Sequence, residues 1–287
     1  MASMIARSAR IATVTGIRHV ARIGAISATT TTTTTTARLA RPSSAMNKTA
    51  TRFFSVSRIA RDDQPRLRLG STAPNFKAET TEGAIDFHEF IGDSWTILFS
   101  HPADFTPVCT TELGAFAKLQ PEFAARNTKL IGLSANGLES HADWIKDIEE
   151  VSTGGTKFNF PIIADADRKV AYLYDMVDHQ DLANVDKAGV AFTIRSVFII
   201  DPNKKIRLTL AYPASTGRNT AEVLRVLDSL QTGDKAGVTT PINWVPGEDV
   251  IVPPSVSDEA AAAKFGEFKA VKPYLRFTKY PEQILKK

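Results

Sequence analysis

The sequence is poorest in cysteine, because Cys109 is the single one among 287 residues. One cysteine excludes an internal disulfide and a zinc site built from several cysteines. The five histidines show no metal-ligand spacing and no glycine loop of the phosphate-binding type occurs, so we expect neither a metal nor another cofactor. No uncharged apolar run approaches the roughly 18 residues of a membrane span, so we expect a soluble protein without stable membrane insertion.

Acidic residues are absent from the first 61 positions, where ten Lys and Arg occur, and Asp62 is the first acid. Taking these ten from the 35 Lys and Arg leaves 25 against 31 acidic residues. Residues 62–287 therefore carry a formal charge of −6, although the whole chain carries +4. An acidic body argues against a nucleic-acid-binding protein, which needs a basic folded surface.

The basic leader is rich in Arg, Ser, Thr and Ala, and residues 4–23 can form an amphipathic basic helix. This pattern is typical of a mitochondrial transit peptide and predicts a mitochondrial protein, most simply of the matrix. The segment RFFS at 52–55 resembles a processing site with cleavage before Ser55. The alternative is a disordered basic arm for nucleic acid, and the Thr29–Thr36 run is not core in either case.

Strand-like and helix-like apolar periods alternate from the first polar segment to about Thr232. Strands are predicted at 95–101, 129–136, 160–165, 192–201 and 205–212, and helices at 107–119, 138–151, near 168–176 and at 220–231. Alternating strands and helices indicate a mostly parallel sheet covered on both faces, with an antiparallel hairpin at its end. We therefore predict an α/β, thioredoxin-like fold, with a mixed central sheet flanked by helices.

The amino-acid composition changes after Gly233, where the chain becomes rich in proline. Short extended segments and one helix at 258–265 are predicted there. Its aromatic residues argue against a disordered tail and indicate a small C-terminal subdomain. We expect three parts: a leader over 1–61, a thioredoxin-like domain over 62–232 and a C-terminal extension over 233–287.

Cys109 lies at a predicted helix start. Thr106 followed by Pro107 is typical of an N-cap and a first helical position, which places Cys109 third in the helix. Free backbone N–H groups and the helix dipole there favour a thiolate over a thiol. The alternative to a reactive thiolate is that Cys109 is a small, buried, unreactive residue of the core, which is more common for a single cysteine.

Arg195 stands in the middle of an otherwise apolar strand, where a guanidinium is costly unless it meets an anion. Two partners are open to it, the thiolate of Cys109 and the carboxylate of Glu112. We expect Arg195 to face the sulfur, and pairing with Glu112 can occur as well.

The run PADFTPVCTTE resembles the active-site signature of the peroxiredoxins, Pro-x-x-x-Thr-x-x-Cys, here Pro102, Thr106 and Cys109. The longer run GDSWTILFSHPADFTPVCTTELG, with YPASTGRN and TPINW, is similar to the 1-Cys subfamily. The resemblance extends from about Leu69 to Tyr280. Together with the basic leader, it is similar to the mitochondrial 1-Cys peroxiredoxins of fungi.

The resemblance implies that the protein is a thiol-dependent peroxidase that reduces hydrogen peroxide and organic hydroperoxides. Cys109 would be the peroxidatic nucleophile. The backbone N–H groups of Cys109 and its neighbour Val108, the Thr106 hydroxyl and the Arg195 guanidinium would stabilise the transition state. Pro102 would shield the sulfenic acid product.

Three further residues have supporting roles under this resemblance. Arg218 matches a second family arginine near the site, and Glu112 can pair with arginine. His101 would orient groups or contact the reductant, unless it is simply a residue at a strand end.

The sulfenic acid must be reduced by another thiol, and this sequence holds no second cysteine. We expect an external reductant: glutathione with a glutaredoxin or transferase, thioredoxin, or transient Cys109–Cys109 pairing between subunits. The resemblance also implies a homodimer.

Two alternative activities follow from the same resemblance. Some subfamily members hydrolyse phospholipids through a Ser-His-Asp set, which Ser94 and His88 match in part. The position of the acid is Asn203, with Asp201 nearby, so we do not expect this activity. The other alternative is a holdase-type chaperone or redox-sensing interaction protein.

Overall fold

A seven-stranded sheet forms the centre of the main domain. The computed structural model describes residues 67–152, 154–179, 181 and 192–285. The strands follow the order β2-β1-β5-β4-β3-β6-β7 across the sheet. Their bounds are β1 Lys77–Thr80, β2 Gly83–Asp86, β3 Trp95–Ser100, β4 Thr128–Ser134, β5 Ile162–Ala164, β6 Arg195–Ile200 and β7 Ile206–Tyr212.

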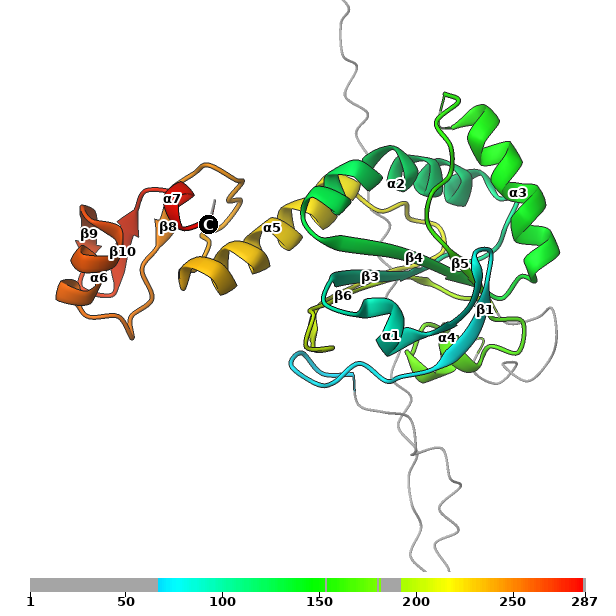
Figure 1. Ribbon diagram of the computed structural model, residues 1–287, viewed down its shortest axis with the longest axis horizontal. Coiled ribbons are helices and arrows are strands. Elements are labelled where there is room, and N and C mark those ends of the chain that lie inside the picture. The colour runs from blue at the N-terminus through cyan, green and yellow to red at the C-terminus, as the bar shows by residue number, and fades with distance from the viewer. Residues whose placement is uncertain (1–66, 153, 180, 182–191, 286–287) are drawn as a thin grey trace, which may run out of the picture. The chain divides into compact units, whose positions relative to one another are not determined.

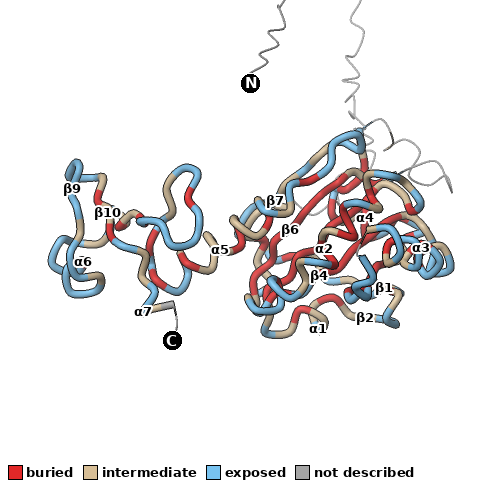
Figure 2. The backbone as a smooth tube through the Cα atoms, turned by 90° about the horizontal axis from the view of Figure 1, so that it is seen from above, coloured by how far each residue is buried: buried red, intermediate tan, exposed pale blue. Residues whose placement is uncertain are grey.

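Helices cover both faces of this sheet (Figure 1). Their bounds are α1 Phe87–Ile91, α2 Pro107–Ala125, α3 Leu138–Val151, α4 Lys169–Leu173 and α5 Thr220–Ala236. Ile97 and Phe99 of β3 belong to the core that contains residues of α2, α3 and α5, whereas Leu98 belongs to the core that contains residues of α1 and α4. Because both faces are covered, every residue of β3 is buried, as Figure 2 shows for the central strands.

The sheet is mixed and flanked by helices, which confirms the predicted fold class, but fewer of its strand pairs are parallel than the alternation of strands and helices indicated. Only the β3–β4 and β4–β5 pairs are parallel. β6 runs antiparallel to β3, and β1 runs antiparallel to β5. The antiparallel β6 has a consequence for the site, because it places Arg195 at the start of β6 beside the end of β3.

The predicted thioredoxin-like elements are all present, but two helices are longer than expected. Helix α2 continues through Pro121 to Ala125, although a proline usually ends a helix. Helix α5 continues to Ala236 and ends at Gly237, which adopts the left-handed conformation. The strands β1 and β2 and the helix α1 were not predicted from the sequence.

The residues after α5 form a second, three-stranded sheet in the order β8-β10-β9. The elements here are β8 Val250–Ile251, α6 Asp258–Phe265, β9 Phe268–Lys272, β10 Leu275–Thr278 and α7 Glu282–Leu285. Trp244 and Val250 are fully buried in a small core of their own, together with Ala236 of α5. The aromatic residues noted in the sequence thus belong to folded structure.

Candidate active site

Cys109 is the third residue of α2, and its side chain is fully buried. Thr106 is the N-cap, with φ −112° and ψ 144°, and Pro107 begins the helix. The Thr106 hydroxyl does not cap the helix, contrary to the prediction, because it donates to the carbonyl of Ala103 at 2.9 Å. The N–H groups of Val108 and Cys109 belong to the first turn, which has no intrahelical acceptor for them.

Arg195 contacts the sulfur. Its Nη1 lies 3.2 Å from Cys109 Sγ and 2.6 Å from Glu112 Oε2. Nε and Nη2 both donate to the carbonyl of Ala214, at 3.0 and 2.8 Å. The structure therefore places Arg195 against both of the partners that the sequence left open.

Arg218 lies on the other side of Glu112. It donates through its backbone N and its Nε to Glu112 Oε1, at 2.6 and 3.1 Å, and through Nη2 to Oε2 at 2.8 Å. Its Nη1 donates to the carbonyls of Ser100 and Ser196 at the adjoining ends of β3 and β6. Arg218 is thus a central part of the cluster and not a peripheral one.

Glu112 is a buried carboxylate between two guanidinium groups. Burial by itself would raise the pKa of Glu112, but the charges and hydrogen bonds of Arg218 and Arg195 outweigh it and lower the pKa below the ordinary value of 4.5. In the described part of the chain, Glu112 is the only carboxylate that pairs with Arg195 or Arg218. One positive charge of this cluster is left over, and the nearest group able to balance it is the sulfur of Cys109.

Pro102 and Val108 are half-buried on the chain around Cys109. Val108 lies close to Gly217, because a Cβ added at Gly217 would come 3.4 Å from Val108 Cγ1. This approach joins the first turn of α2 to the loop that carries Arg218. The side chains expected around the cysteine therefore come from α2, from β6 and from the loop before α5.

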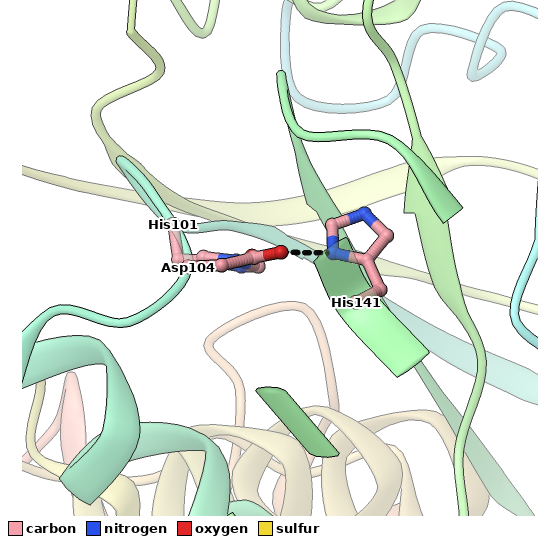
Figure 3. A group of neighbouring side chains, drawn as sticks. All are labelled: His101, Asp104 and His141. Atoms are coloured by element: carbon pink, nitrogen blue, oxygen red, sulfur yellow. Dashed lines mark hydrogen bonds and ion pairs between the residues drawn. The ribbon is translucent and has the colours of Figure 1, made fainter. Parts of the chain in front are cut away.

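The side chain of His101 is fully buried, like that of Cys109. Its Nε2 lies 2.9 Å from Asp104 Oδ1, and Nδ1 has no partner among the described residues. The second oxygen of Asp104 lies 2.7 Å from Nδ1 of His141 (Figure 3). Burial lowers the pKa of His101.

Asp104 and His141 were not predicted from the sequence, although a signal for His141 existed. His141 stands three residues before Trp144 and seven before Ile148, on the apolar face of α3. A histidine on such a face needs buried hydrogen-bonding partners. Asp104 lies in the PADF segment, and its pairing with a residue of α3 is visible only in three dimensions.

Ser94, His88 and Asp201, the residues of the alternative phospholipase set, form hydrogen bonds with other described groups and not with one another. Ser94 Oγ donates to Asn127 Oδ1 at 3.0 Å, and His88 Nε2 lies 2.8 Å from the carbonyl of Ala73. Asp201 accepts from the backbone N of Lys205 in the turn after β6. Within residues 67–152, no hydrogen bond joins Ser94 to His88.

Family models and curated relatives agree with this geometry. The AhpC/TSA family model matches residues 69–209, and a model of the C-terminal domain of 1-Cys peroxiredoxin matches residues 229–267. The chain is 58% identical to the mitochondrial peroxiredoxin PRX1 of Saccharomyces cerevisiae over 237 residues, 83% of this chain and 90% of that protein. It is 49% identical to peroxiredoxin-6 of Homo sapiens over 223 residues, 75% of this chain and 98% of that protein.

Solved structures lead to the same family. A structure of yeast mitochondrial 1-Cys peroxiredoxin, studied for thiol resolution via glutathione and thioredoxin systems, matches with a TM-score of 0.68 and 59% identity and covers 75% of this chain and 100% of that one. A structure of peroxiredoxin 6 from Arenicola marina matches with a TM-score of 0.71 and 44% identity and covers 76% of this chain and 100% of that one.

The predicted localisation agrees with these relatives. The leader lies outside the described residues, but the yeast protein is named as mitochondrial, which confirms a mitochondrial localisation for this chain. Among the described residues, no helix has the length and apolar character needed to cross a lipid bilayer. On its sequence, fold and relatives, the chain belongs to the peroxiredoxin family, as a 1-Cys member and a thiol-dependent peroxidase.

Proposed function

We propose that Cys109 is the peroxidatic nucleophile of this enzyme. Its thiolate attacks the terminal oxygen of a hydroperoxide, an S–O bond forms as the O–O bond breaks, and the sulfur is oxidised to sulfenic acid. The alkoxide or hydroxide that leaves takes up a proton. The observation that carries this proposal is the charge arrangement: two buried guanidinium groups share the single carboxylate of Glu112, and Arg195 Nη1 lies 3.2 Å from the sulfur.

The other groups act on the charge that develops during the reaction. Arg195 and the N–H groups of Val108 and Cys109 stabilise negative charge on sulfur and the peroxide oxygens. Thr106 supplies a hydroxyl at the helix start, and Pro102 shields the product.

Three further residues support this site. Glu112 and Arg218 hold Arg195 in place through the contacts described above. Nε2 of His101 is hydrogen-bonded to Asp104, so Nδ1 is the ring nitrogen that can contact other groups in the site.

Replacement of Cys109 by serine tests the nucleophile. We expect peroxide consumption by Cys109→Ser to fall to the uncatalysed rate, because a serine hydroxyl is far less nucleophilic than a thiolate. The measurement is the disappearance of hydrogen peroxide and of an organic hydroperoxide, with folding checked by circular dichroism. A Cys109→Ser protein that consumes peroxide as fast as the wild type would remove the basis of this proposal.

The reductant that we propose is an external thiol, because the sequence holds one cysteine and cannot form an internal disulfide. The yeast relative supports the glutathione and thioredoxin systems as candidates, and a glutaredoxin is the further candidate that we carry from the sequence. Turnover with each system in turn separates them. Without any added thiol, one cysteine can consume at most about three equivalents of peroxide, on oxidation to the sulfonic acid. Sustained turnover beyond that amount without a thiol would contradict an external reductant.

A homodimer and a three-part chain complete the proposal. Among the described strands, β7 is the last of the main sheet and pairs only with β6, so a second copy can pair with its other edge. Light scattering that gives the mass of a monomer would refute the dimer. We keep the division into 1–61, 62–232 and 233–287, and the separate core of the C-terminal sheet supports a C-terminal part, although α5 crosses the second boundary and ends at Ala236. A mature mitochondrial N-terminus at Met1 would refute cleavage near Ser55.

A further inference from the structure

A fully buried polar cluster lies next to the peroxidatic helix. The carboxylate of Asp104 lies between the rings of His101 and His141 (Figure 3), and all three side chains are fully enclosed. Ser140 Oγ donates to Asp104 Oδ2 at 2.7 Å, and Ser134 Oγ lies 3.5 Å from Oδ1. One loop residue is thus joined to the ends of β3 and β4 and to the first turn of α3.

The partners of His141 determine how many protons its ring carries. Nε2 lies 3.2 Å from the carbonyl oxygen of Ile163, and a carbonyl can only accept, so Nε2 carries a hydrogen. Nδ1 lies 2.7 Å from Asp104 Oδ2, and an ionised carboxylate also can only accept. Both ring nitrogens therefore carry hydrogens, and the ring is an imidazolium.

The other two members of the cluster fit this assignment. Burial would raise the pKa of Asp104, but hydrogen bonds from His101 and His141 outweigh it and lower the pKa below the ordinary value of 3.8, which keeps the carboxylate ionised. Burial lowers the pKa of His101, which stays neutral with its hydrogen on Nε2. The cluster then holds one anion and one cation, and among the described residues Arg218 is a further charged group that acts on His101.

A metal ion is the other way to place a positive charge here, because the three ligand atoms lie within 4.8 Å of one another. A metal-bound histidine almost always donates its second N–H to an acceptor. Nδ1 of His101 has no such partner in the described part of the chain. A proton on His141 therefore fits these residues better than a metal.

The backbone segment that begins at Asp104 continues directly into the first turn of α2, which carries Cys109. Phe105 follows Asp104 with φ 54°, a left-handed conformation that a bulky residue keeps only when its surroundings impose it. Asp104 is held at both ends, through its carboxylate and through its backbone N, which donates to Asn136 Oδ1 at 3.1 Å. Thr106 then begins α2, with Cys109 in the first turn.

Helix α3 holds the same turn by a second contact. Trp144, one turn after His141 and fully buried, donates from Nε1 to Thr110 Oγ1 at 3.0 Å. The start of α3 therefore supports both the loop before Cys109 and the residue after it.

We propose that His141 is a buried imidazolium whose ion pair with Asp104 positions the loop 101–106 and, through it, the first turn of α2 that carries Cys109. Asp104 and His141 are positioning residues, since neither touches the sulfur. The kinetic consequence rests on the proposed role of Cys109, whereas the charge of His141 does not.

The charge is tested by nitrogen NMR on protein with ¹⁵N-labelled histidine. The sequence has five histidines, and a His141→Gln spectrum identifies the signals of His141. At neutral pH we expect both of its ring nitrogens to be protonated. In Asp104→Asn the carboxamide has the same shape but no charge, its oxygen accepts from His101 and its NH2 can donate to a neutral His141. We therefore expect one protonated nitrogen on His141 in this variant.

Positioning is tested by two reactions of Cys109 that should change in opposite directions. Oxidation by hydrogen peroxide should slow about tenfold in Asp104→Asn and about 10 to 100-fold in Asp104→Ala, since small displacements of reacting groups carry costs of this size. Alkylation of the buried thiol by bromobimane should accelerate in the same variants, because a loosened loop exposes it. Asp228→Asn is the matched control: it breaks the Arg126–Asp228 pair away from the loop and should leave both reactions unchanged.

Each part can be overturned separately. A single protonated nitrogen on His141 in the folded wild type, or stoichiometric metal in elemental analysis of the purified protein, would overturn the imidazolium. Unchanged oxidation and alkylation in a folded Asp104→Asn that has lost the His141 charge would overturn the positioning role. Failure of Cys109→Ser to abolish peroxidase activity would overturn the proposed function instead, and would leave the NMR result intact.

Discussion

At the scale of single residues, the important feature is the net charge of the buried groups around Cys109. Arg195, Arg218 and Glu112 are buried together and sum to one positive charge. An uncompensated buried charge is expensive, so the cluster favours an anion beside Arg195, where the sulfur of Cys109 lies 3.2 Å from Nη1. Glu112 keeps both guanidinium groups in place without cancelling the charge that Cys109 meets.

Replacement of Arg195 by methionine should remove this stabilisation while keeping much of the buried volume. We expect the second-order rate of Cys109 oxidation by peroxide to fall about 10²–10³-fold, the usual cost of losing one donor to a developing anion. Stopped-flow measurement of a single oxidation event gives this rate. Arg126→Met, which removes the pairs of Arg126 with Glu122 and Asp228, should leave the rate unchanged. Equal rates in Arg195→Met and wild type would show that Arg195 does not act on the sulfur.

At the scale of elements, α2 and α3 fit closely where Gly114 faces Ser152. A Cβ added at Gly114 would come 2.3 Å from Ser152 Cβ, a distance that real Cβ atoms essentially never show. The glycine therefore sets how closely the end of α3 approaches the helix that carries Cys109.

Gly114→Ala should thus destabilise the protein, although the same change in an exposed helix stabilises it by about 1 kcal/mol. We expect a loss of about 1–3 kcal/mol from overpacking, measured as the free energy of unfolding in urea. The double variant Gly114→Ala with Ser152→Gly should recover most of the loss, because the clashing atom is gone. A single variant more stable than the wild type would contradict the close contact.

At the scale of the whole molecule, acid stability reflects two buried carboxylates whose pKa values are lowered, Asp104 and Glu112. The pKa values of Asp104 and Glu112 are lowered from 3.8 and 4.5, so the unfolded chain binds protons at a higher pH than the folded one. Their stabilisation is complete above about pH 5 and is lost as the pH falls through the ordinary values towards the folded ones. Asp165 acts in the opposite direction, because burial raises its pKa.

We expect the free energy of unfolding to fall by about 1–3 kcal/mol between about pH 5 and pH 3. Urea unfolding at a series of pH values measures this dependence. The slope should be smaller in Asp104→Asn, which has no carboxyl group to titrate at this position. An identical slope in variant and wild type would show that Asp104 does not contribute.

Local signals in the sequence were sufficient to predict helix α2 and to place Cys109 in its first turn. The Thr106–Pro107 start of α2 depends on a few neighbouring residues, and so does the alternation that produces β3 and β4. The single cysteine by itself excludes an internal resolving partner, whatever the fold. The basic leader and its change to an acidic body are likewise properties of composition.

Only the tertiary structure decided which distant residues meet. Arg195 lies 86 positions from Cys109, and Arg218 lies 106 positions from Glu112, so their contacts depend on strand order and direction. The antiparallel β6 brings Arg195 to the end of β3. The sequence predicted that Arg195 faces the sulfur, but it did not predict the direction of the strand that carries Arg195. The Asp104–His141 pair needed the same information, since hydrogen bonds between separate elements leave no periodic pattern in the chain.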